Sequence, residues 1–510
     1  MSDTKRKRIQ PHAANRWLDI LAAAFVALFA MAIVIRPLPN YDIWWMLAVG
    51  RRIVETGAYI YKDPFTFTVT GAPWSPQGYA SAILFFVLHK LGGMAALSAL
   101  RVLLVWGILA FTFRTLRRIG VSWALAAPLV VVMLVTSHSR LTDRGQLFEY
   151  VIIAWFVGFL LTSHEREGKS YFILPVAVQL LWVQLHSSFL LGPVLTAVFF
   201  ASEWIGTRMG DSHALHRHNW TRAWLLVLFL ALACIVNPNP KAFLIQPFDP
   251  EQRELVSRFT LEWKSPFDPA IAGGNFHPYY EILLTLAALA VIVRCLRLPL
   301  APVTFMAATA YLSLQSHRFR VEFALVAVPM IAVLLEGASF WRRWRASRTA
   351  WAAAGLAVSL ALMGIERERA LVSHDIPELY PDAALDFVMR ENIAHRPFHS
   401  IGFGSYMLWH CYGERQTFID GRNFSMPLNR DFLLGQARET AFHGMVDKYR
   451  LDSFILPSVP RSSTGFMNIH QWLYSSRERW PLVYADERAF VYVSRESVDS
   501  LWLEAHAMPR

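Results

Sequence analysis

Long apolar segments recur along the whole chain. They occupy residues 20–35, 124–135, 151–161, 189–201, 225–236, 282–293 and 325–335. Most of them can be extended toward the roughly 20 residues that cross a hydrocarbon core about 30 Å thick. The pattern predicts an α-helical polytopic membrane protein.

The amino-acid composition supports this class. Hydrophobic residues make up 55% of the 510 residues and charged residues only 17%, whereas roughly 25% of an average soluble domain is charged. The mean hydropathy is positive. A soluble globule of this length would not need so much apolar surface, so the composition indicates an integral membrane protein.

Cysteine content and net charge add two exclusions. Cys234, Cys295 and Cys411 are scattered, so they suggest neither a disulfide framework nor a metal-binding spacing. The net charge of +11 comes mostly from basic clusters between the apolar segments. It therefore does not imply a nucleic-acid partner.

The basic clusters predict the orientation, because Lys and Arg are retained in short cytoplasmic loops. Residues 1–16 form a basic N-terminus that we place in the cytoplasm. The later clusters, within 114–118, 166–169, 208–222, 294–297 and 342–348, join it on that side if the chain has about eleven spans. These spans are 17–36, 94–113, 121–137, 147–162, 171–186, 188–205, 223–237, 279–293, 299–316, 319–337 and 349–365.

This arrangement requires that the apolar run 79–91 does not cross the membrane. A run of that length is more typical of an interfacial or re-entrant helix. The first span lacks a small-residue cleavage site, so we interpret it as a retained anchor and not as a signal peptide. Residues 17–365 thus form the predicted transmembrane module, with a large first outer loop at 37–93.

An odd number of spans places the C-terminal region, 366–510, outside the membrane. Its composition is that of a soluble α/β domain. Residues 382–392 have helical spacing, and 416–419 and 453–456 have the pattern of short strands. Residues 482–493 predict two strands around a turn at 485–487.

Polar residues that are hard to explain as lipid-facing gather at the predicted outer ends of the spans and in outer loops. They are Asp42, Asp63, Arg140, Asp143, Arg144, His186, Asn237, His277, His317, Arg318 and Arg320. Charged groups at membrane depth are costly and usually face a cavity or a partner. A single outward-facing site would bring these polar residues together.

The first outer loop contains the candidate for catalysis. Asp42 follows the first span and precedes Trp44 and Trp45, where a carboxylate could deprotonate a hydroxyl delivered from the aqueous side. Asp42 could instead be the N-cap of a helix that continues to about residue 56, and the tryptophans could be interfacial anchors. Asp63, before Pro64, also suits a turn.

Several motifs carry a resemblance to a known superfamily. They are Asp42-Ile43-Trp44-Trp45, Asp63-Pro64-Phe65, Pro73-Trp74, Arg144-Gly145-Gln146-Leu147-Phe148, Leu181-Trp182-Val183-Gln184-Leu185-His186, Asn237-Pro238 and Phe418-Ile419-Asp420-Gly421-Arg422. In this order they resemble a bacterial branch of the GT-C glycosyltransferases, related to protein mannosyltransferases and aminoarabinose transferases. Many relatives carry His-Glu-Trp where this chain has Gln77-Gly78-Tyr79, which leaves a second carboxylate role open.

The resemblance implies a transferase that uses a polyprenyl-phosphate-linked donor and delivers a hexosyl or pentosyl group to a glycan, lipid or protein acceptor. The implied location is the outer face of a bacterial cytoplasmic (inner) membrane, with membrane lipid as a further partner. It also implies that the essential acidic residue of the first outer loop is Asp42. A divalent cation cofactor stays open.

Negative charge that builds on the departing phosphate could be stabilised by arginine, because its guanidinium group binds phosphate oxygens bidentately. The candidates are Arg140, Arg144, His317, Arg318 and Arg320. These arginines could instead snorkel or pair with nearby acids such as Asp143 and Glu322. His186 could bind substrate or be a turn histidine.

Other functional classes remain as alternatives at this stage. An oligosaccharide ligase of the same fold is the nearest. A transporter would often show inverted repeats and polar groups near the membrane midplane, and we see no clear repeat. A non-catalytic scaffold for cell-surface polysaccharide would tolerate loss of a single carboxylate, which separates it from an enzyme.

Overall fold

The computed structural model describes residues 16–34, 40–121, 123–165, 168–209, 219–245, 248–250, 254, 261–268, 278–294, 299–336, 355, 380–422, 424–458 and 463–508. His277, residues 1–15 and nearly all of the predicted span 349–365 lie outside them. The chain divides into two compact units. Unit 1 comprises Met1–Arg36, Ser98–Asn237 and Thr260–His374, and unit 2 comprises Pro37–Leu97, Pro238–Phe259 and Asp375–Arg510.

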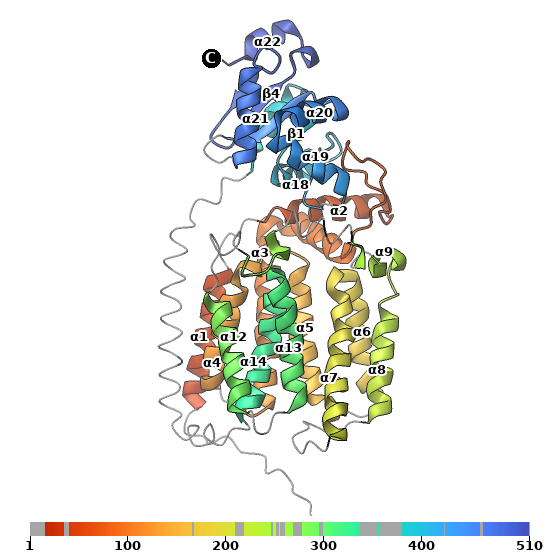
Figure 1. Cartoon of the computed structure of the whole chain (residues 1–510), viewed down its shortest axis with the longest axis vertical. Coiled ribbons are helices and arrows are strands. Elements are labelled where there is room, and N and C mark those ends of the chain that lie inside the picture. Colours follow the sequence, from red (N-terminus) through yellow and green to blue (C-terminus); the bar gives the residue numbers. More distant parts are fainter. Residues whose placement is uncertain are drawn as a thin grey trace, which may run out of the picture. The chain divides into compact units, whose positions relative to one another are not determined.

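Unit 1 is a bundle of helices that lie side by side (Figure 1). Its long helices are α1 (Arg16–Val34), the second part of α3 (Tyr79–Arg118), α4 (Trp123–Ser137), α5 (Gln146–Thr162), α6 (Ser170–Leu185), α7 (Leu191–Arg208), α8 (Trp220–Ala233), α12 (Pro278–Val293), α13 (Leu300–Gln315) and α14 (Arg320–Glu336). Short 3₁₀ turns follow or precede several of them: η2 (His138–Arg140), η3 (Ser163–Glu165), η4 (Ser187–Leu190), η6 (Leu261–Trp263) and η7 (His317–Phe319).

The helices predicted from the apolar pattern are confirmed as helices. Each predicted span from 17–36 to 319–337 coincides with a described helix within a few residues. By length and composition, three described helical stretches could cross a membrane: Tyr79–Arg118, Gln146–Glu165 and Ser187–Arg208. Shorter apolar helices of 10–17 residues include Ala126–Arg140, Ser170–Leu185, Trp220–Ala233 and Pro278–Val293.

Helix α14 lies at the centre of this bundle. It packs against α4, α5, α12 and α13, and Val321 to Leu334 are almost entirely buried. A helix that is apolar on all faces is typical of such a position. The charged residues at its first turn, Arg320 and Glu322, are therefore also buried.

Helix α3 is broken at two glycines. Gly92 and Gly93 have non-helical backbone angles, and Gly93 adopts φ 59° and ψ −150°, a region essentially restricted to glycine. The break separates 79–91 from the predicted span 94–113, as the sequence suggested. The part before Ser98 belongs to unit 2 and the rest to unit 1.

Unit 2 contains a four-stranded sheet in the order β1-β2-β4-β3. Strand β1 (Pro397–His399) pairs in parallel with β2 (Ser453–Pro457), whereas β4 (Ala489–Val493) is antiparallel to both β2 and β3 (Leu482–Ala485). The predicted strand at 453–456 and the predicted pair within 482–493 are confirmed. β1 was not predicted, because three residues are too few to show an alternating pattern.

Unit 2 also contains helices, several of which lie beside the sheet in Figure 1. They are α2 (Asp42–Thr56), α9 (Pro240–Ile245), α17 (Asp382–Arg390), α18 (Ile401–His410), α19 (Met426–Ala437), α20 (Glu439–Tyr449), α21 (Thr464–Ser475) and α22 (Ser500–His506). The helix predicted at 382–392 is confirmed as α17. The core is aromatic, with Phe398, Phe418, Phe454 and Trp480 buried together, and Phe67 from the first outer loop packs against it.

The strand predicted at 416–419 is wrong. This segment forms a single bridge, in which Thr417 lies beside Thr66 of the first outer loop. Thr417 donates its N–H to the Phe65 carbonyl at 3.0 Å, and Phe67 donates to the Thr417 carbonyl at 3.1 Å. The apolar pattern reflects burial against the loop, which local sequence cannot distinguish from burial in a sheet.

Candidate functional site

Asp42 is the first residue of α2 and is half-buried. Its Oδ1 accepts a hydrogen bond from Trp45 Nε1 at 3.1 Å, and its backbone N–H donates to Asn40 Oδ1 at 3.1 Å. The N-cap position falls on Tyr41, whose side chain makes no capping bond. The alternative in which Asp42 is itself the N-cap is therefore wrong, although a carboxylate in the first turn still favours the helix dipole.

The turn at Gly421 closes the other side of Asp42. A Cβ at Gly421 would lie 2.9 Å from Asp42 Oδ1 and 3.0 Å from Ser405 Oγ. The Gly421 N–H donates to that Ser405 hydroxyl at 2.9 Å. Only glycine leaves room here, so the C-terminal motif and the first outer loop meet at the proposed catalytic carboxylate.

The neighbouring Arg422 holds the same two segments together. Its guanidinium binds Asp420 bidentately, at 2.7 and 2.6 Å, and reaches Asp63 Oδ1 at 2.6 Å. It also lies 4.6 Å from the ring centroid of Trp74 and 4.8 Å from that of Phe65. Burial alone would lower the pKa of Arg422, but Asp420 and Asp63 raise it above its usual value.

Asp63 is thus placed inside the protein and not on a surface. It is 1% exposed, and besides Arg422 its carboxylate accepts from the backbone N–H groups of Phe65 and Thr66 and from the Thr66 hydroxyl. Asp63 therefore also stabilises a turn, as the sequence suggested. These bonds position the loop that carries Asp42.

His399 anchors the motif from the sheet side. Its Nε2 accepts from the Phe418 N–H at 2.9 Å, and its Nδ1 lies 2.9 Å from the Ser400 carbonyl. Burial lowers the pKa of His399 to about 4. The imidazole is neutral near pH 7 and can keep accepting this bond.

In unit 1, several of the predicted basic residues form ion pairs with acidic side chains. Arg140 Nη1 lies 2.7 Å from Glu262 Oε1, and Arg144 Nη1 donates to the same oxygen at 2.8 Å. Burial by itself would raise the pKa of Glu262, but Arg140 and Arg144 outweigh burial and lower it. Asp143 points to a different partner, Arg101, at 3.1 Å.

A second set of contacts involves the end of α6 and the start of α14. His186 Nδ1 lies 2.9 Å from Glu149 Oε2. Glu149 in turn interacts with Glu322 and with Arg318. The His186 ring also contacts Ser188 at 2.8 Å, so the turn role considered for this histidine is present together with an acidic neighbour.

The residues of η7 and α14 complete this cluster. Arg318 lies with its guanidinium 4.5 Å from the ring centroid of Trp263 and is half-buried. Arg320 is fully buried and bonds to Ser139. Burial, together with Arg320 and Arg140, lowers the pKa of His317 to about 4. Its own backbone N–H donates to the Lys264 carbonyl at 2.8 Å.

Sequence reasoning therefore found the basic residues of this cluster but missed two of its acids, Glu149 and Glu262. The signal was available for Glu149, which interrupts the apolar run of α5 three residues after Gln146. Glu262 gave no such signal because it lies in a polar connection. Asn237 donates a hydrogen bond to the Cys234 carbonyl at the end of α8.

Within the described part of the chain, no three His, Cys, Asp or Glu side chains are grouped so that they could hold a metal ion. Glu262 lies against Arg140, and Glu149 lies against His186. The arrangement can bind an anion and can orient a hydroxyl.

No protein-family model and no curated protein matches this sequence. Solved structures do share its fold. The oligosaccharyltransferase AglB from Archaeoglobus fulgidus, in complex with an inhibitory peptide and a dolichol-phosphate, has a TM-score of 0.60 at 12% identity, over 95% of this chain and 75% of AglB. ArnT from Cupriavidus metallidurans, bound to undecaprenyl phosphate, has a TM-score of 0.53 at 12% identity, over 98% of this chain and 100% of ArnT.

Both similarities extend over nearly the whole chain. The chain therefore shares the fold of these two solved structures. Function has to be argued from the site, because one fold hosts many activities.

Proposed function

We propose that this protein transfers a hexosyl or pentosyl group from a polyprenyl-phosphate donor to an acceptor hydroxyl at the outer face of the cytoplasmic membrane. The main observation behind this proposal is the position of Asp42. Its half-buried carboxylate accepts a hydrogen bond from Trp45 and lies next to the Gly421 turn. The GT-C fold supports the proposal, since the resemblance implies an essential acid at this position.

In this proposal Asp42 accepts the proton of the acceptor hydroxyl, and the hydroxyl oxygen forms the new bond to the anomeric carbon of the donor sugar. The bond from that carbon to the phosphate oxygen breaks, and the phosphate leaves with the electron pair. General-base work of this kind contributes on the order of 10² to 10⁴-fold in rate.

The departing phosphate gains negative charge, and we propose that basic residues predicted from the sequence bind it. We assign its direct contacts to Arg144 and Arg318, which are only partly buried, with His186 and His317 beside them. Arg140 and Arg320 are nearly or fully buried and orient the cluster. Asp143 and Asp63, expected in the binding set, act as positioning residues through Arg101 and Arg422.

We further propose the topology inferred from the charge pattern. About eleven spans would place the N-terminus in the cytoplasm and residues 366–510 outside, which is the periplasm in a Gram-negative host. The described helices support this arrangement by coinciding with the predicted spans. A lipid-linked donor and a glycan, lipid or protein acceptor would then meet the enzyme at the outer surface.

The decisive experiment compares Asp42→Asn with wild type, using purified full-length protein and labelled polyprenyl-phosphate sugars. Asparagine keeps the shape and can still accept from Trp45, so the variant should fold but lose at least about 99% of transfer. Asp499→Asn is the matched control, because Asp499 is a helix N-cap and asparagine caps a helix about as well as aspartate. Near-normal turnover by folded Asp42→Asn would remove Asp42 from the site and reject the general-base role.

An oligosaccharide ligase is the second candidate. The observation in its favour is that an oligosaccharyltransferase shares this fold, with a TM-score of 0.60. Offering donors that carry one sugar or a preassembled oligosaccharide in the same assay separates the two, because only a ligase would prefer the longer glycan.

A further inference from the structure

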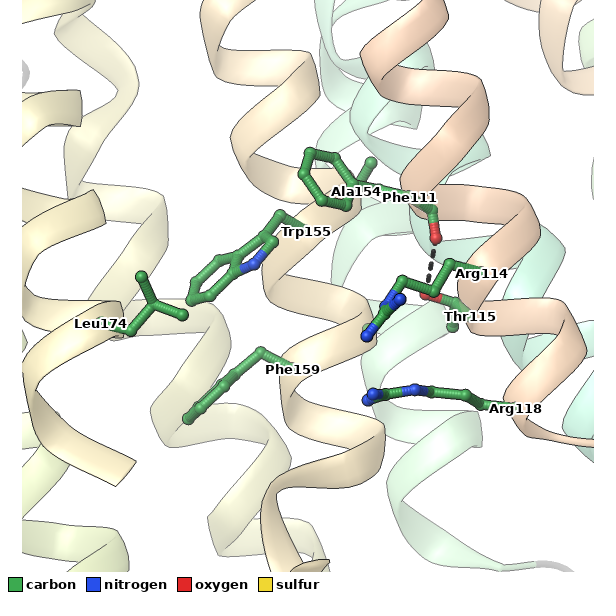
Figure 2. A pocket seen from close by; sticks show the side chains of 9 residues that line it. Phe111, Arg114, Thr115, Arg118, Ala154, Trp155, Phe159 and Leu174 are labelled. Atoms are coloured by element: carbon green, nitrogen blue, oxygen red, sulfur yellow. Dashed lines mark hydrogen bonds between the residues drawn. The ribbon is translucent and has the colours of Figure 1, made fainter. Parts of the chain in front are cut away.

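A cavity of about 280 Å³ opens in unit 1 between α3, α5 and α6. Arg114 and Arg118 of α3 extend toward Trp155 and Phe159 of α5, as Figure 2 shows. The cavity lies near the last turns of α3 and α5. At a rise of about 1.5 Å per residue, Phe159 is roughly 15 Å along α5 from Glu149, so this cavity is separate from the acidic and basic cluster described above.

The positive charge in the cavity is not neutralised by the described residues. Arg114 and Arg118 are four residues apart, on one face of the helix, where like charges repel. Arg118 donates to the Thr162 hydroxyl at 3.1 Å, a neutral group. Within the described part of the chain, no ion pair to a carboxylate is formed by either arginine, and both are exposed.

The remaining walls are apolar. Trp155 and Phe159 stack with ring centroids 5.5 Å apart, and Leu174 of α6 lies at the opposite side. Gly158 opens the space between the helices, because any side chain there would collide with the Thr115 hydroxyl. Two cations beside an apolar wall match an anionic head group that is attached to acyl chains.

We propose that this cavity binds the phosphate head group of an anionic phospholipid, with Arg114 and Arg118 on the phosphate and Trp155, Phe159 and Leu174 along the lipid. The positive-inside pattern places this end of α3 in the cytoplasmic leaflet, where basic pockets between helices bind anionic head groups. The site goes beyond the proposed sugar transfer, which concerns the other end of the bundle.

The test uses full-length protein in nanodiscs of phosphatidylcholine, with or without phosphatidylglycerol. Bound phosphatidylglycerol is counted by native mass spectrometry, and thermal unfolding is followed by tryptophan fluorescence. Wild type should retain phosphatidylglycerol and unfold at a higher temperature with it. Arg114→Gln combined with Arg118→Gln should weaken this binding about tenfold or more, and the double Lys variant should restore part of it.

Arg208→Gln is the matched control, because it removes one positive charge from the end of α7 outside the cavity. It should respond to phosphatidylglycerol like wild type. If the double Gln variant does not fold, Arg114→Gln alone should show the same weakening at smaller size, since the Arg114 side chain is exposed.

A response to phosphatidylglycerol that is equal in the double Gln variant and in wild type would overturn the proposal. Protection of the protein by millimolar inorganic phosphate in phosphatidylcholine nanodiscs, as large as that by the lipid, would also overturn it in favour of a soluble anion. Both readouts are independent of sugar transfer, so failure here and failure of the proposed function are distinguishable.

Discussion

At the scale of single residues, burial distinguishes charged groups that hold the structure from those that can meet a ligand. Asp63 and Asp143 are buried against Arg422 and Arg101. Breaking one partner of a buried pair leaves an uncompensated charge, whereas a half-buried arginine such as Arg318 can exchange an aromatic neighbour for a phosphate. The two kinds of residue therefore predict different defects.

Arg318 should affect donor binding more than folding. We expect Arg318→Ala to raise the donor KM about ten- to a hundredfold, which corresponds to the loss of a charged hydrogen bond. Lys should recover only part of the affinity, because an ammonium cannot form the fork. Steady-state kinetics at varied donor concentration measures this effect. Arg222→Ala, on the exposed start of α8, should be silent, and an unchanged KM in Arg318→Ala would reject the assignment.

Arg422 should affect folding. Replacing it by Ala leaves Asp63 and Asp420 buried without their cation, which costs about 3–5 kcal/mol. The first outer loop should then become sensitive to limited proteolysis at a lower temperature than in wild type. Arg390→Ala removes a mostly exposed pair with Glu391, worth about 0–1 kcal/mol, and should not change the digestion pattern. Equal digestion of both variants would contradict the role given to Arg422.

At the scale of elements, the segment 416–422 links the C-terminal domain to the start of α2. Thr417 pairs with the loop, His399 accepts from Phe418, and the turn at Gly421 faces Asp42. The segment therefore acts as a positioning element for the proposed base. A change at the Gly421 turn should therefore affect activity more than stability.

Gly421→Ala tests this role. Its Cβ would press on Asp42 Oδ1 and Ser405 Oγ, at 2.9 and 3.0 Å. A displacement of the base by less than about 1 Å can cost up to about 10²-fold in rate, so kcat should fall at least tenfold while the protein still folds. Gly444→Ala is the control, because nothing lies within 4 Å of a Cβ there. Retention of kcat in Gly421→Ala would show that the turn does not position Asp42.

At the scale of the whole molecule, the sequence predicts helices far better than it predicts pairing between distant segments. Apolar runs report burial that is local in sequence, and the helices of unit 1 follow them. The bridge between Thr66 and Thr417, and the ion pair between Asp63 and Arg422, join segments some 350 residues apart, for which local patterns carry no signal. The same reason explains why Glu262 was missed as the partner of two predicted arginines.

The topology is the prediction with the widest consequence. If basic loops face the cytoplasm, fusions that end after Arg118 or Arg208 should fluoresce when joined to green fluorescent protein and should be inactive when joined to alkaline phosphatase. Fusions after Gln146 or Asp420 should show the reverse. The fusion after Asp420 matters most, because the segment that faces Asp42 lies around it, and a donor phosphate at the outer leaflet requires Asp42 on the same side. A cytoplasmic result at Asp420 would therefore contradict both the eleven-span arrangement and sugar transfer at the outer face.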